Sequence, residues 1–285
     1  EEKKMPNVLE NISSNLEVLR SPGHEIVILS DIDGTIMSHS DYDTGCFMDT
    51  MDILKYHNIV VIPVTSKTLL ELEMSQSILK FHGPRIAENG GVISISDHAH
   101  DIDCHHETII KVLSELPKSV LSQMKCLSKL SIREIQEITN LPHAQAESAR
   151  TRLASETFSW TGTVDCEKRL ILHLREHNLR LVKGGRFYHV IGMRDKAHAS
   201  KKLIEFMYGK KPNPSFEVWA LGDAENDFSL LKLADKRAII KNTKIDQSYL
   251  VKNLKSAYFS KQEAPFGWAE SIEKLTQKKW EINIG

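Results

Sequence analysis

Two carboxylates stand two residues apart in the string Asp31-Ile32-Asp33-Gly34-Thr35, directly after an apolar run at residues 26–29. A short run of β-branched and aliphatic residues is typical of a strand that is buried on both faces. Where the chain leaves such a sheet, two carboxylates can share a hard divalent cation, while one faces a substrate and the other faces its leaving oxygen. Taken alone, the string also fits a loop with solvated acidic side chains.

Polar residues follow two further apolar runs in the same way. Thr65-Ser66-Lys67 follows residues 59–64, and Gly222-Asp223 follows residues 218–221. The carboxyl ends of parallel strands open onto one crevice, so we expect these groups to converge there. A helix-like segment at 47–56 separates the first two runs, which predicts an α/β fold with a Rossmann-like parallel sheet.

The middle of the chain has a different pattern. Between about residues 94 and 189, charged helical stretches alternate with short strand-like pieces, and residues 179–190 form a strand–turn–strand pattern. We therefore predict a core domain from residues 25–93 and 190–285, interrupted by an inserted α+β domain at 94–189. Residues 1–24 are predicted to be a helical extension, because leucine and isoleucine recur there at helical spacing.

Composition limits the partners of the chain. The 37 Lys and Arg residues nearly cancel 38 Asp and Glu residues, so no global positive field attracts nucleic acid or an anionic membrane. Any bound anion must be held by a local cluster of donors.

The four cysteines form no CxxC pair, which argues against a structural zinc site. No apolar run approaches the length of about 18 residues that a membrane-spanning helix needs. We expect a cytoplasmic protein whose partner is a small metabolite, with no nucleic-acid or membrane partner.

Four motifs occur in the order and strand context of the haloacid-dehalogenase superfamily, which the chain resembles. They are Asp31-Ile32-Asp33-Gly34-Thr35, Thr65, Lys196, and Gly222-Asp223-Ala224-Glu225-Asn226-Asp227. The resemblance implies a phosphatase in which Asp31 attacks phosphorus and forms an aspartyl-phosphate. It also implies that Asp33 protonates the leaving alkoxide and then activates water. Thr65 and Lys196 would bind the phosphoryl oxygens.

The same resemblance implies a Mg²⁺ site. The Asp31 carboxylate, the Asp33 backbone carbonyl and Asp223 would ligate the ion. Asn226 and Asp227 would ligate at the edge or orient the other ligands.

Within the superfamily, the insertion resembles the cap domain of the subgroup that acts on small sugar and polyol phosphates. The strings at 64–68, 87–91 and 184–189, and Gly267-Trp268, resemble those of the mannosyl-3-phosphoglycerate phosphatase family. This resemblance implies substrate contacts from Ser66, Lys67, Asn89, Arg152, Glu156, Gly184, Gly185, Arg186 and His189.

The cap departs from the family pattern, because the run Arg152-Leu153-Ala154-Ser155-Glu156-Thr157 lacks the family's first glutamate and its proline. We predict a Mg²⁺-dependent phosphatase for mannosyl-3-phosphoglycerate or a related glycosyl-3-phosphoglycerate. The alternatives are a phosphatase for another sugar phosphate or a phosphoprotein, and a non-catalytic binding module that keeps the fold. The complete set of catalytic residue types argues against the last alternative. The sequence predicts neither the glycosyl group nor the oligomeric state.

Overall fold

The computed structural model describes residues 5–19, 25–38, 45–79, 81, 83–96, 99–210 and 216–277. The chain forms two compact units. One combines residues 1–64 with 200–285, and the other is the continuous segment 65–199.

The first unit contains a parallel sheet of five strands in the order β12-β11-β10-β1-β2. The strands are β1 (Glu25–Ser30), β2 (Val60–Pro63), β10 (Phe216–Gly222), β11 (Lys236–Lys241) and β12 (Tyr258–Glu263). Every residue of β1 after Glu25 is buried, as the apolar run predicted. The parallel sheet confirms the predicted α/β fold class with a Rossmann-like core.

Strands β1 and β10 end together. Their register pairs Glu25 with Phe216 and Ser30 with Leu221, and the amide of Asp31 donates to the carbonyl of Leu221 at 3.0 Å. The residues that follow the two strands, Asp31 and Asp223, therefore leave the same edge of the sheet.

Helices cover both faces of this sheet. They are α1 (Met5–Leu19), α2 (Gly45–Tyr56), α10 (Phe228–Leu233), α11 (Ser248–Asn253) and α12 (Phe266–Leu275). The chain moves from β1 to β2 in one direction along the sheet and from β10 to β11 in the other. Because crossovers between parallel strands are right-handed, α2 and α10 cover opposite faces.

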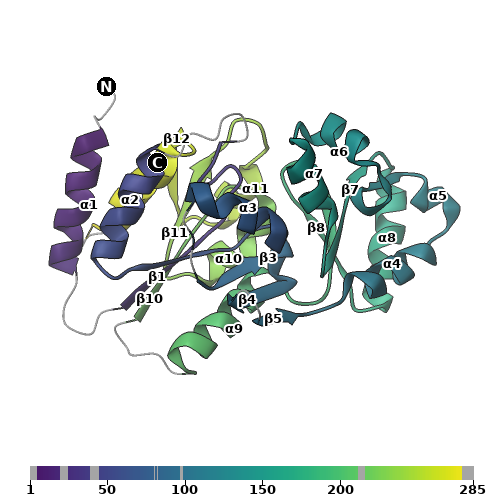
Figure 1. Cartoon of the computed structure of the whole chain (residues 1–285), viewed down its shortest axis with the longest axis horizontal. Coiled ribbons are helices and arrows are strands. Elements are labelled where there is room, and N and C mark those ends of the chain that lie inside the picture. The colour runs from purple at the N-terminus through teal and green to yellow at the C-terminus, as the bar shows by residue number, and fades with distance from the viewer. Residues whose placement is uncertain are drawn as a thin grey trace. The chain divides into compact units, whose positions relative to one another are not determined.

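An α-helix occupies the N-terminal segment where the leucine spacing predicted one. Helix α1 packs against α2 and α12 and buries Ile12 and Leu16 completely (Figure 1). Residues 1–4 and 20–24 of the predicted extension lie outside the described residues.

Trp268 of α12 contacts the residue that precedes the turn at 31–37. Its ring is fully buried and meets Phe47 edge to face, with ring centroids 5.0 Å apart. Its indole Nε1 donates to the Ser30 hydroxyl at 3.0 Å. That hydroxyl in turn donates to the carbonyl of Asp31 at 2.8 Å. The backbone at Asp31 is thus held from its own sheet and from α12.

The second unit contains two antiparallel sheets. One has the order β3-β4-β5 and the other β6-β7-β9-β8. The strands are β3 (Arg85–Ala87), β4 (Val92–Ser96), β5 (Ala99–Ile102), β6 (Met124–Cys126), β7 (Ser155–Trp160), β8 (Arg180–Lys183) and β9 (Tyr188–Ile191). Strands β8 and β9 are the hairpin predicted at 179–190.

Helices accompany these sheets, and an apolar core lies between them. The helices are α3 (Leu69–Leu79), α4 (His106–Ser114), α5 (Lys118–Leu121), α6 (Ile132–Thr139), α7 (His143–Arg150) and α8 (Val164–Glu176). Helix α9 (Lys196–Tyr208) begins in this unit and crosses the border at residue 199. Ile109 of α4 and Leu174 of α8 pack with Phe158 and Val190 of the four-stranded sheet. The insertion is therefore α+β. The domain borders predicted at 93/94 and 189/190 fall inside this unit and remain a prediction.

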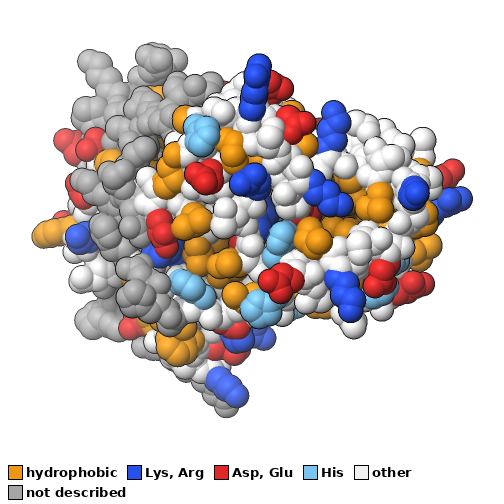
Figure 2. Space-filling view, turned by 45° about the vertical axis from the view of Figure 1, so that its right-hand side comes forward, with side chains coloured by type: hydrophobic (Ala, Val, Ile, Leu, Met, Phe, Trp, Pro, Cys, Tyr) orange, Lys and Arg blue, Asp and Glu red, His pale blue; other side chains and the backbone are white. Residues whose placement is uncertain are grey.

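Neither charge predominates among the described side chains on the face that Figure 2 shows. Acidic and basic side chains of the described residues are interspersed on the face in Figure 2, as the near-zero net charge implies. No helix among the described residues has both the length and the apolar character needed to cross a membrane.

Candidate active site

A tight turn follows β1 and sets the position of the two aspartates. The carbonyl of Ile32 accepts hydrogen bonds from the amides of Thr35, Ile36 and Met37 at 3.2, 2.9 and 3.0 Å. The amide of Gly34 donates to the carbonyl of Met37 at 2.7 Å. Asp31 is buried, whereas Asp33 is partly exposed.

Gly34 allows this turn to lie against Asp223. Its φ is +82°, a conformation that L side chains adopt rarely. A Cβ atom at this position would lie 2.4 Å from Asp223 Oδ2. Both the backbone conformation and the lack of space therefore require glycine here.

Three buried aspartates gather at the ends of β1 and β10. One carboxylate oxygen from each of Asp31, Asp223 and Asp227 lies within 4.8 Å of the others. Asp223 Oδ1 accepts from the Thr35 hydroxyl at 3.2 Å, and Asp223 Oδ2 accepts from Asn242 Nδ2 at 2.8 Å. Asp227 belongs to a short 3₁₀ turn, Glu225–Asp227, and its Oδ2 accepts from the amides of Asp223 and Ala224.

This donor set fits a divalent cation. Like charges this close repel one another, and a bound cation would offset the repulsion. Oxygen-only ligands are what hard ions such as Mg²⁺ and Ca²⁺ prefer. Asn226, partly buried in the same 3₁₀ turn, adds an amide oxygen to the available donors.

Two amide side chains that the sequence analysis missed orient Asp223. The side-chain amide of Asn242 donates a hydrogen bond to the Asp223 carboxylate. Gln247 Nε2 donates to the backbone carbonyls of Asp223 and Ile240 at 2.7 and 2.8 Å. Gln247 Oε1 accepts from the Asn242 amide at 3.1 Å. Asn242 follows β11 directly, so the signal that identified Asp31 and Asp223, a polar residue at the end of a buried strand, could have identified Asn242 too. Gln247 carries no such signal.

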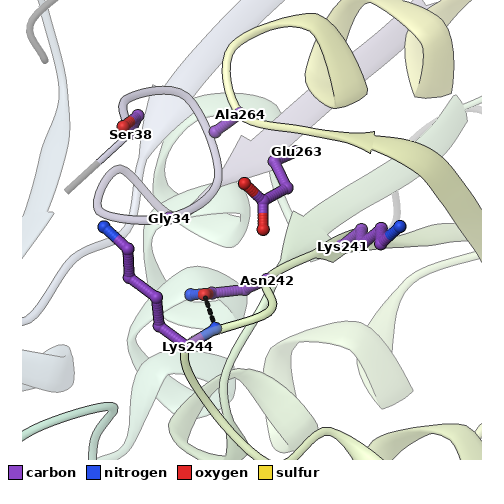
Figure 3. Close-up of a pocket in the computed structure, with 7 residues that line it drawn as sticks. All are labelled: Gly34, Ser38, Lys241, Asn242, Lys244, Glu263 and Ala264. Carbon is purple, nitrogen blue, oxygen red and sulfur yellow. Dashed lines mark hydrogen bonds between the residues drawn. The ribbon is translucent and has the colours of Figure 1, made fainter. Parts of the chain in front are cut away.

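A pocket opens beside the turn that follows β1 (Figure 3). Its lining residues are Gly34, Ser38, Lys241, Asn242, Lys244, Glu263 and Ala264. The Asn242 side chain accepts from the backbone amide of Lys244 at 3.0 Å. Hydrogen bonds from the hydroxyl and amide of Thr243 hold the pKa of Glu263 below its usual value, so Glu263 is ionised at neutral pH. Because Lys241 and Lys244 outnumber the single carboxylate of Glu263, the charged residues that line the pocket carry a net positive charge.

In the second unit, the loops that follow β2 and β3 are joined by backbone hydrogen bonds. Asn89 N donates to the Thr65 carbonyl, and Glu88 N donates to the Lys67 carbonyl, both at 2.9 Å. The Thr65 hydroxyl accepts from the Lys67 amide at 3.2 Å. Thr65, Lys67 and Asn89 therefore lie in one local structure.

Glu88 fixes the segment that carries Arg152. It is fully buried, and its carboxylate accepts from the amides of Leu153 and Ala154 and from the Ser155 hydroxyl at 2.8, 3.0 and 2.6 Å. Its φ of +51° is uncommon for a residue other than glycine. Glu88 is not among the predicted site residues, although it lies inside the 87–91 string.

Arg152 connects this segment to Ser66. Its guanidinium donates to the Ser66 carbonyl at 3.3 Å and to the Ser155 hydroxyl at 2.9 Å. Its buried Nε has no hydrogen-bond partner within the described part of the chain. Since a buried unpaired donor is costly, the site favours an acceptor at this position.

His189 and Glu156 lie on the neighbouring strands β9 and β7. His189 Nδ1 is 2.9 Å from the Thr157 hydroxyl. Burial, together with the charges of Arg152 and Lys196, lowers the pKa of His189 to about 3, so the imidazole is neutral at physiological pH. Burial alone would raise the pKa of Glu156, but hydrogen bonds from His106 and Ser128 outweigh it and hold that pKa below its usual value.

The predicted site residues thus fall into two groups. The first unit brings together Asp31, Asp33, Asp223, Asn226 and Asp227. In the second unit, hydrogen bonds connect Thr65, Lys67 and Asn89, and a further hydrogen bond joins Arg152 to Ser66. The charges of Arg152 and Lys196 act on His189.

The remaining predicted residues lie on β7 and on the hairpin. Glu156 is buried in β7 and bonded to His106 at 3.0 Å. Gly184 lies close to His189, because a Cβ atom on it would be 3.0 Å from His189 Nε2. Gly185 and Arg186 are exposed. Arg186 donates to the Thr139 carbonyl of α6 at 3.4 Å.

Known proteins resemble the chain in sequence and in fold. No family model matches it. It is 30% identical over 267 residues to a glucosyl-3-phosphoglycerate/mannosyl-3-phosphoglycerate phosphatase from Persephonella marina, covering 88% of this chain and 97% of that protein. Its fold is similar to that of a haloacid dehalogenase-like hydrolase from B. subtilis, with TM-score 0.62, 13% identity and coverage of 88% and 98%. It is also similar to a sucrose-phosphatase from Synechocystis, with TM-score 0.62, 14% identity and coverage of 87% and 95%.

Replacing Gly34 is predicted to disturb the cation site. In Gly34→Ala the new Cβ must displace the Asp223 carboxylate, and a change of this kind typically weakens metal binding about 10- to 100-fold. The measurement is calorimetric titration with Mn²⁺. Gly209→Ala is the matched control, because Gly209 has a similar φ of +86° but open space around it. A folded Gly34→Ala protein with unchanged Mn²⁺ affinity would contradict the assigned cluster.

The buried neutral His189 is predicted to make stability depend on pH. In the unfolded chain its pKa is about 6.5, whereas in the folded chain it is about 3. Between these values the unfolded state binds the extra proton, so stability is lost as pH falls, by about 1.4 kcal/mol per pH unit below 6.5.

Denaturant titrations at pH 7 and pH 5 test this prediction. The wild-type protein should lose about 2 kcal/mol more of its free energy of unfolding over this interval than His189→Gln does. His143→Gln, an exposed histidine of the same unit, serves as control. If the free energy of unfolding of wild type and His189→Gln depended on pH in the same way, the pKa of His189 would not be lowered by folding. The imidazole would then be protonated in the folded protein at pH 5.

Proposed function

The chain belongs to the glucosyl-3-phosphoglycerate/mannosyl-3-phosphoglycerate phosphatase family of haloacid-dehalogenase-type hydrolases, and from this premise we propose the substrate and mechanism of its reaction. It is a phosphoric monoester hydrolase. The proposed substrate is a glycosyl-3-phosphoglycerate, and the proposed intermediate is an aspartyl-phosphate on Asp31. The observation that carries the proposal is the buried cluster of Asp31, Asp223 and Asp227.

In the first proposed step, an Asp31 carboxylate oxygen attacks phosphorus. The bond between phosphorus and the glycerate oxygen breaks, and the electron pair goes to the leaving alkoxide. Asp33 donates a proton to that oxygen, which releases the glycosylglycerate. The burial of Asp31 supports its role as a nucleophile shielded from bulk water, and the partial exposure of Asp33 leaves it accessible to the leaving group.

In the second proposed step, water attacks the phosphorus of the aspartyl-phosphate. Asp33 accepts a proton from this water, and the bond between phosphorus and the Asp31 oxygen breaks. Inorganic phosphate leaves, and the Asp31 carboxylate and the protonated Asp33 are restored for the next cycle.

Asp31, Asp223 and Asp227, with Asn226 and the Asp33 carbonyl, would hold Mg²⁺. When bound, the ion would offset the negative charge of the nucleophile and of the phosphoryl group. The hydrogen bonds from Thr35 and Asn242 to the two oxygens of Asp223 support this role, because they fix the carboxylate in one orientation.

Thr65 and Lys196 are proposed to bind the transferring phosphoryl oxygens. Thr65 follows Val64, whose amide donates to the Ser30 carbonyl at 2.8 Å. Lys196 begins α9, and its side chain is almost completely buried. A lysine held out of water interacts strongly with an anion such as a phosphate.

Recognition of the organic part of the substrate is proposed for the remaining residues of the second unit. They are Ser66, Lys67, Asn89, Arg152, Glu156, Gly184, Gly185, Arg186 and His189. The neutral His189 can exchange hydrogen bonds with a hydroxyl, and the buried Nε of Arg152 can donate to a carboxylate.

Phosphate release from a panel of esters tests the proposed function. We expect mannosyl- or glucosyl-3-phosphoglycerate to give a higher kcat/KM than hexose phosphates or phosphopeptides. EDTA should abolish turnover, and Mg²⁺ should restore it. Turnover in EDTA would contradict the metal role. Faster hydrolysis of a hexose phosphate or a phosphopeptide would contradict the substrate but not the reaction.

Asp31→Asn is the control for the mechanism in this panel. The amide cannot form the acyl-phosphate, so turnover of every substrate should be lost while the circular dichroism spectrum is unchanged. Retained turnover would show that another residue is the nucleophile.

The two arginines are predicted to differ in their effect on specificity. A charge-assisted hydrogen bond contributes about 1.5–3 kcal/mol, so Arg152→Ala should lower kcat/KM for a glycosyl-3-phosphoglycerate about 10- to 150-fold. Arg186→Ala should have a smaller effect, because Arg186 is exposed and its charge is screened by water.

An aryl phosphate provides the internal reference, since it lacks the glycerate carboxylate. Its kcat/KM should change little in either variant. A loss of the same size on both substrates in Arg152→Ala would mean that Arg152 supports the structure rather than the carboxylate.

A further inference from the structure

Two histidines and a glutamate meet at the C-terminal ends of α4 and α8 in the second unit. His173 lies in the last turn of α8, His177 follows the helix as its C-cap residue, and Glu115 is the C-cap residue of α4. One ring nitrogen of each histidine and one carboxylate oxygen of Glu115 lie within 4.8 Å of one another. None of the three belongs to the phosphatase site.

Hydrogen bonds set the tautomer of both imidazoles. His173 Nε2 lies 2.9 Å from the Val112 carbonyl, and His177 Nδ1 lies 2.9 Å from the His173 carbonyl. A carbonyl oxygen only accepts, so each of these nitrogens carries a proton and donates it. In the neutral rings, Nδ1 of His173 and Nε2 of His177 then carry lone pairs. Metal-bound histidines typically have this arrangement, in which the second nitrogen donates to a carbonyl or a carboxylate.

The lone pair of His177 is placed opposite another acceptor. Its Nε2 is 3.5 Å from Glu115 Oε2. Two acceptors at this distance repel unless a proton or a metal ion lies between them. A proton would make His177 an imidazolium, whereas a metal ion would also use a ring nitrogen of His173, four residues earlier in the chain.

We propose that His173, His177 and Glu115 form a Zn²⁺ site. Two imidazoles and one carboxylate form a ligand set that Zn²⁺ uses, whereas Mg²⁺ and Ca²⁺ prefer oxygen ligands alone. Tetrahedral Zn²⁺ with bonds of about 2.0–2.1 Å places its ligand atoms about 3.4 Å apart. The ligand atoms lie within 4.8 Å of one another, and the exposed Glu115 and His177 have room to approach that spacing.

The bound ion links two helices that are distant in sequence. Beneath the three ligands, Val112 and Leu113 of α4 and Leu170 and Leu174 of α8 belong to the apolar core of the unit. This core fixes the helix backbones, and the ion joins their ends at the surface. Three protein ligands leave the fourth position to water. The site therefore stabilises the second unit and lies outside the catalytic chemistry.

Calorimetric titration of the full chain with Zn²⁺, in excess Mg²⁺ to occupy the aspartate cluster, tests the site. We expect one Zn²⁺ per chain in the wild-type protein. His173→Gln and His177→Gln should each weaken this binding by at least about 10-fold, and Zn²⁺ should raise the thermal midpoint of the wild-type protein more than that of either of these two variants. His143→Gln is the matched control, because His143 is an exposed histidine at the start of α7, and it should bind Zn²⁺ like the wild-type protein.

Two outcomes would overturn the proposal. One is equal Zn²⁺ affinity and stoichiometry in the wild-type, His173→Gln and His177→Gln proteins, since the ion would then bind elsewhere. The other is no Zn²⁺ binding in the wild-type protein together with loss of stability in His177→Gln at pH 5.5 but not at pH 8. That result would assign the cluster to an imidazolium–carboxylate pair.

Discussion

The repulsion among three buried carboxylates is the constraint on which much of the first unit depends. Asp31, Asp223 and Asp227 are brought within 4.8 Å because β1 and β10 are neighbours that end at the same edge. Burial raises the cost of their charge, so every lone pair without a donor is expensive. The surrounding structure supplies donors to Asp223 through a hydroxyl and an amide side chain, and donors to Asp227 through the two backbone amides that precede its 3₁₀ turn. The absence of a Cβ at Gly34 lets the turn after β1 lie against the Asp223 carboxylate.

The sequence contained enough local signal to predict the sheet and the acidic cluster. Four or more apolar residues followed by a polar residue mark a buried parallel strand and the point where it meets the site, as at Ser30 and Asp31. At β11 the pattern is weaker, because only Ala238, Ile239 and Ile240 are apolar and Lys241 stands before Asn242. Gln247 could not be found in this way, because its partners, the carbonyls of Asp223 and Ile240, come together only in the folded chain.

In the second unit, residue type was less informative than tertiary contact. Glu88 reads as an ordinary acidic residue in a glycine-containing loop, yet it is fully buried and holds the segment from Leu153 to Ser155. Arg186 stays a predicted substrate contact, and the sequence did not indicate that its guanidinium donates to the Thr139 carbonyl at the end of α6. The histidine pair on α8 gave no signal by itself because its third partner lies on α4. In each case the missing information is which distant segments pack together, and local periodicity does not contain it.

The hydrogen bond between Trp268 and Ser30 has a consequence for how the protein is made. These two residues are 238 positions apart in sequence, and the central pairing of β1 with β10 also spans the whole second unit. During synthesis on the ribosome, residues 65–199 emerge as one continuous segment with an apolar core of their own. Strand β1 emerges before this segment, whereas its partner β10 and its anchor in α12 emerge after it. The nascent chain therefore leaves the β10-facing edge of β1 unpaired until residues 216–268 have been made, and chaperones can bind the apolar strand during this interval.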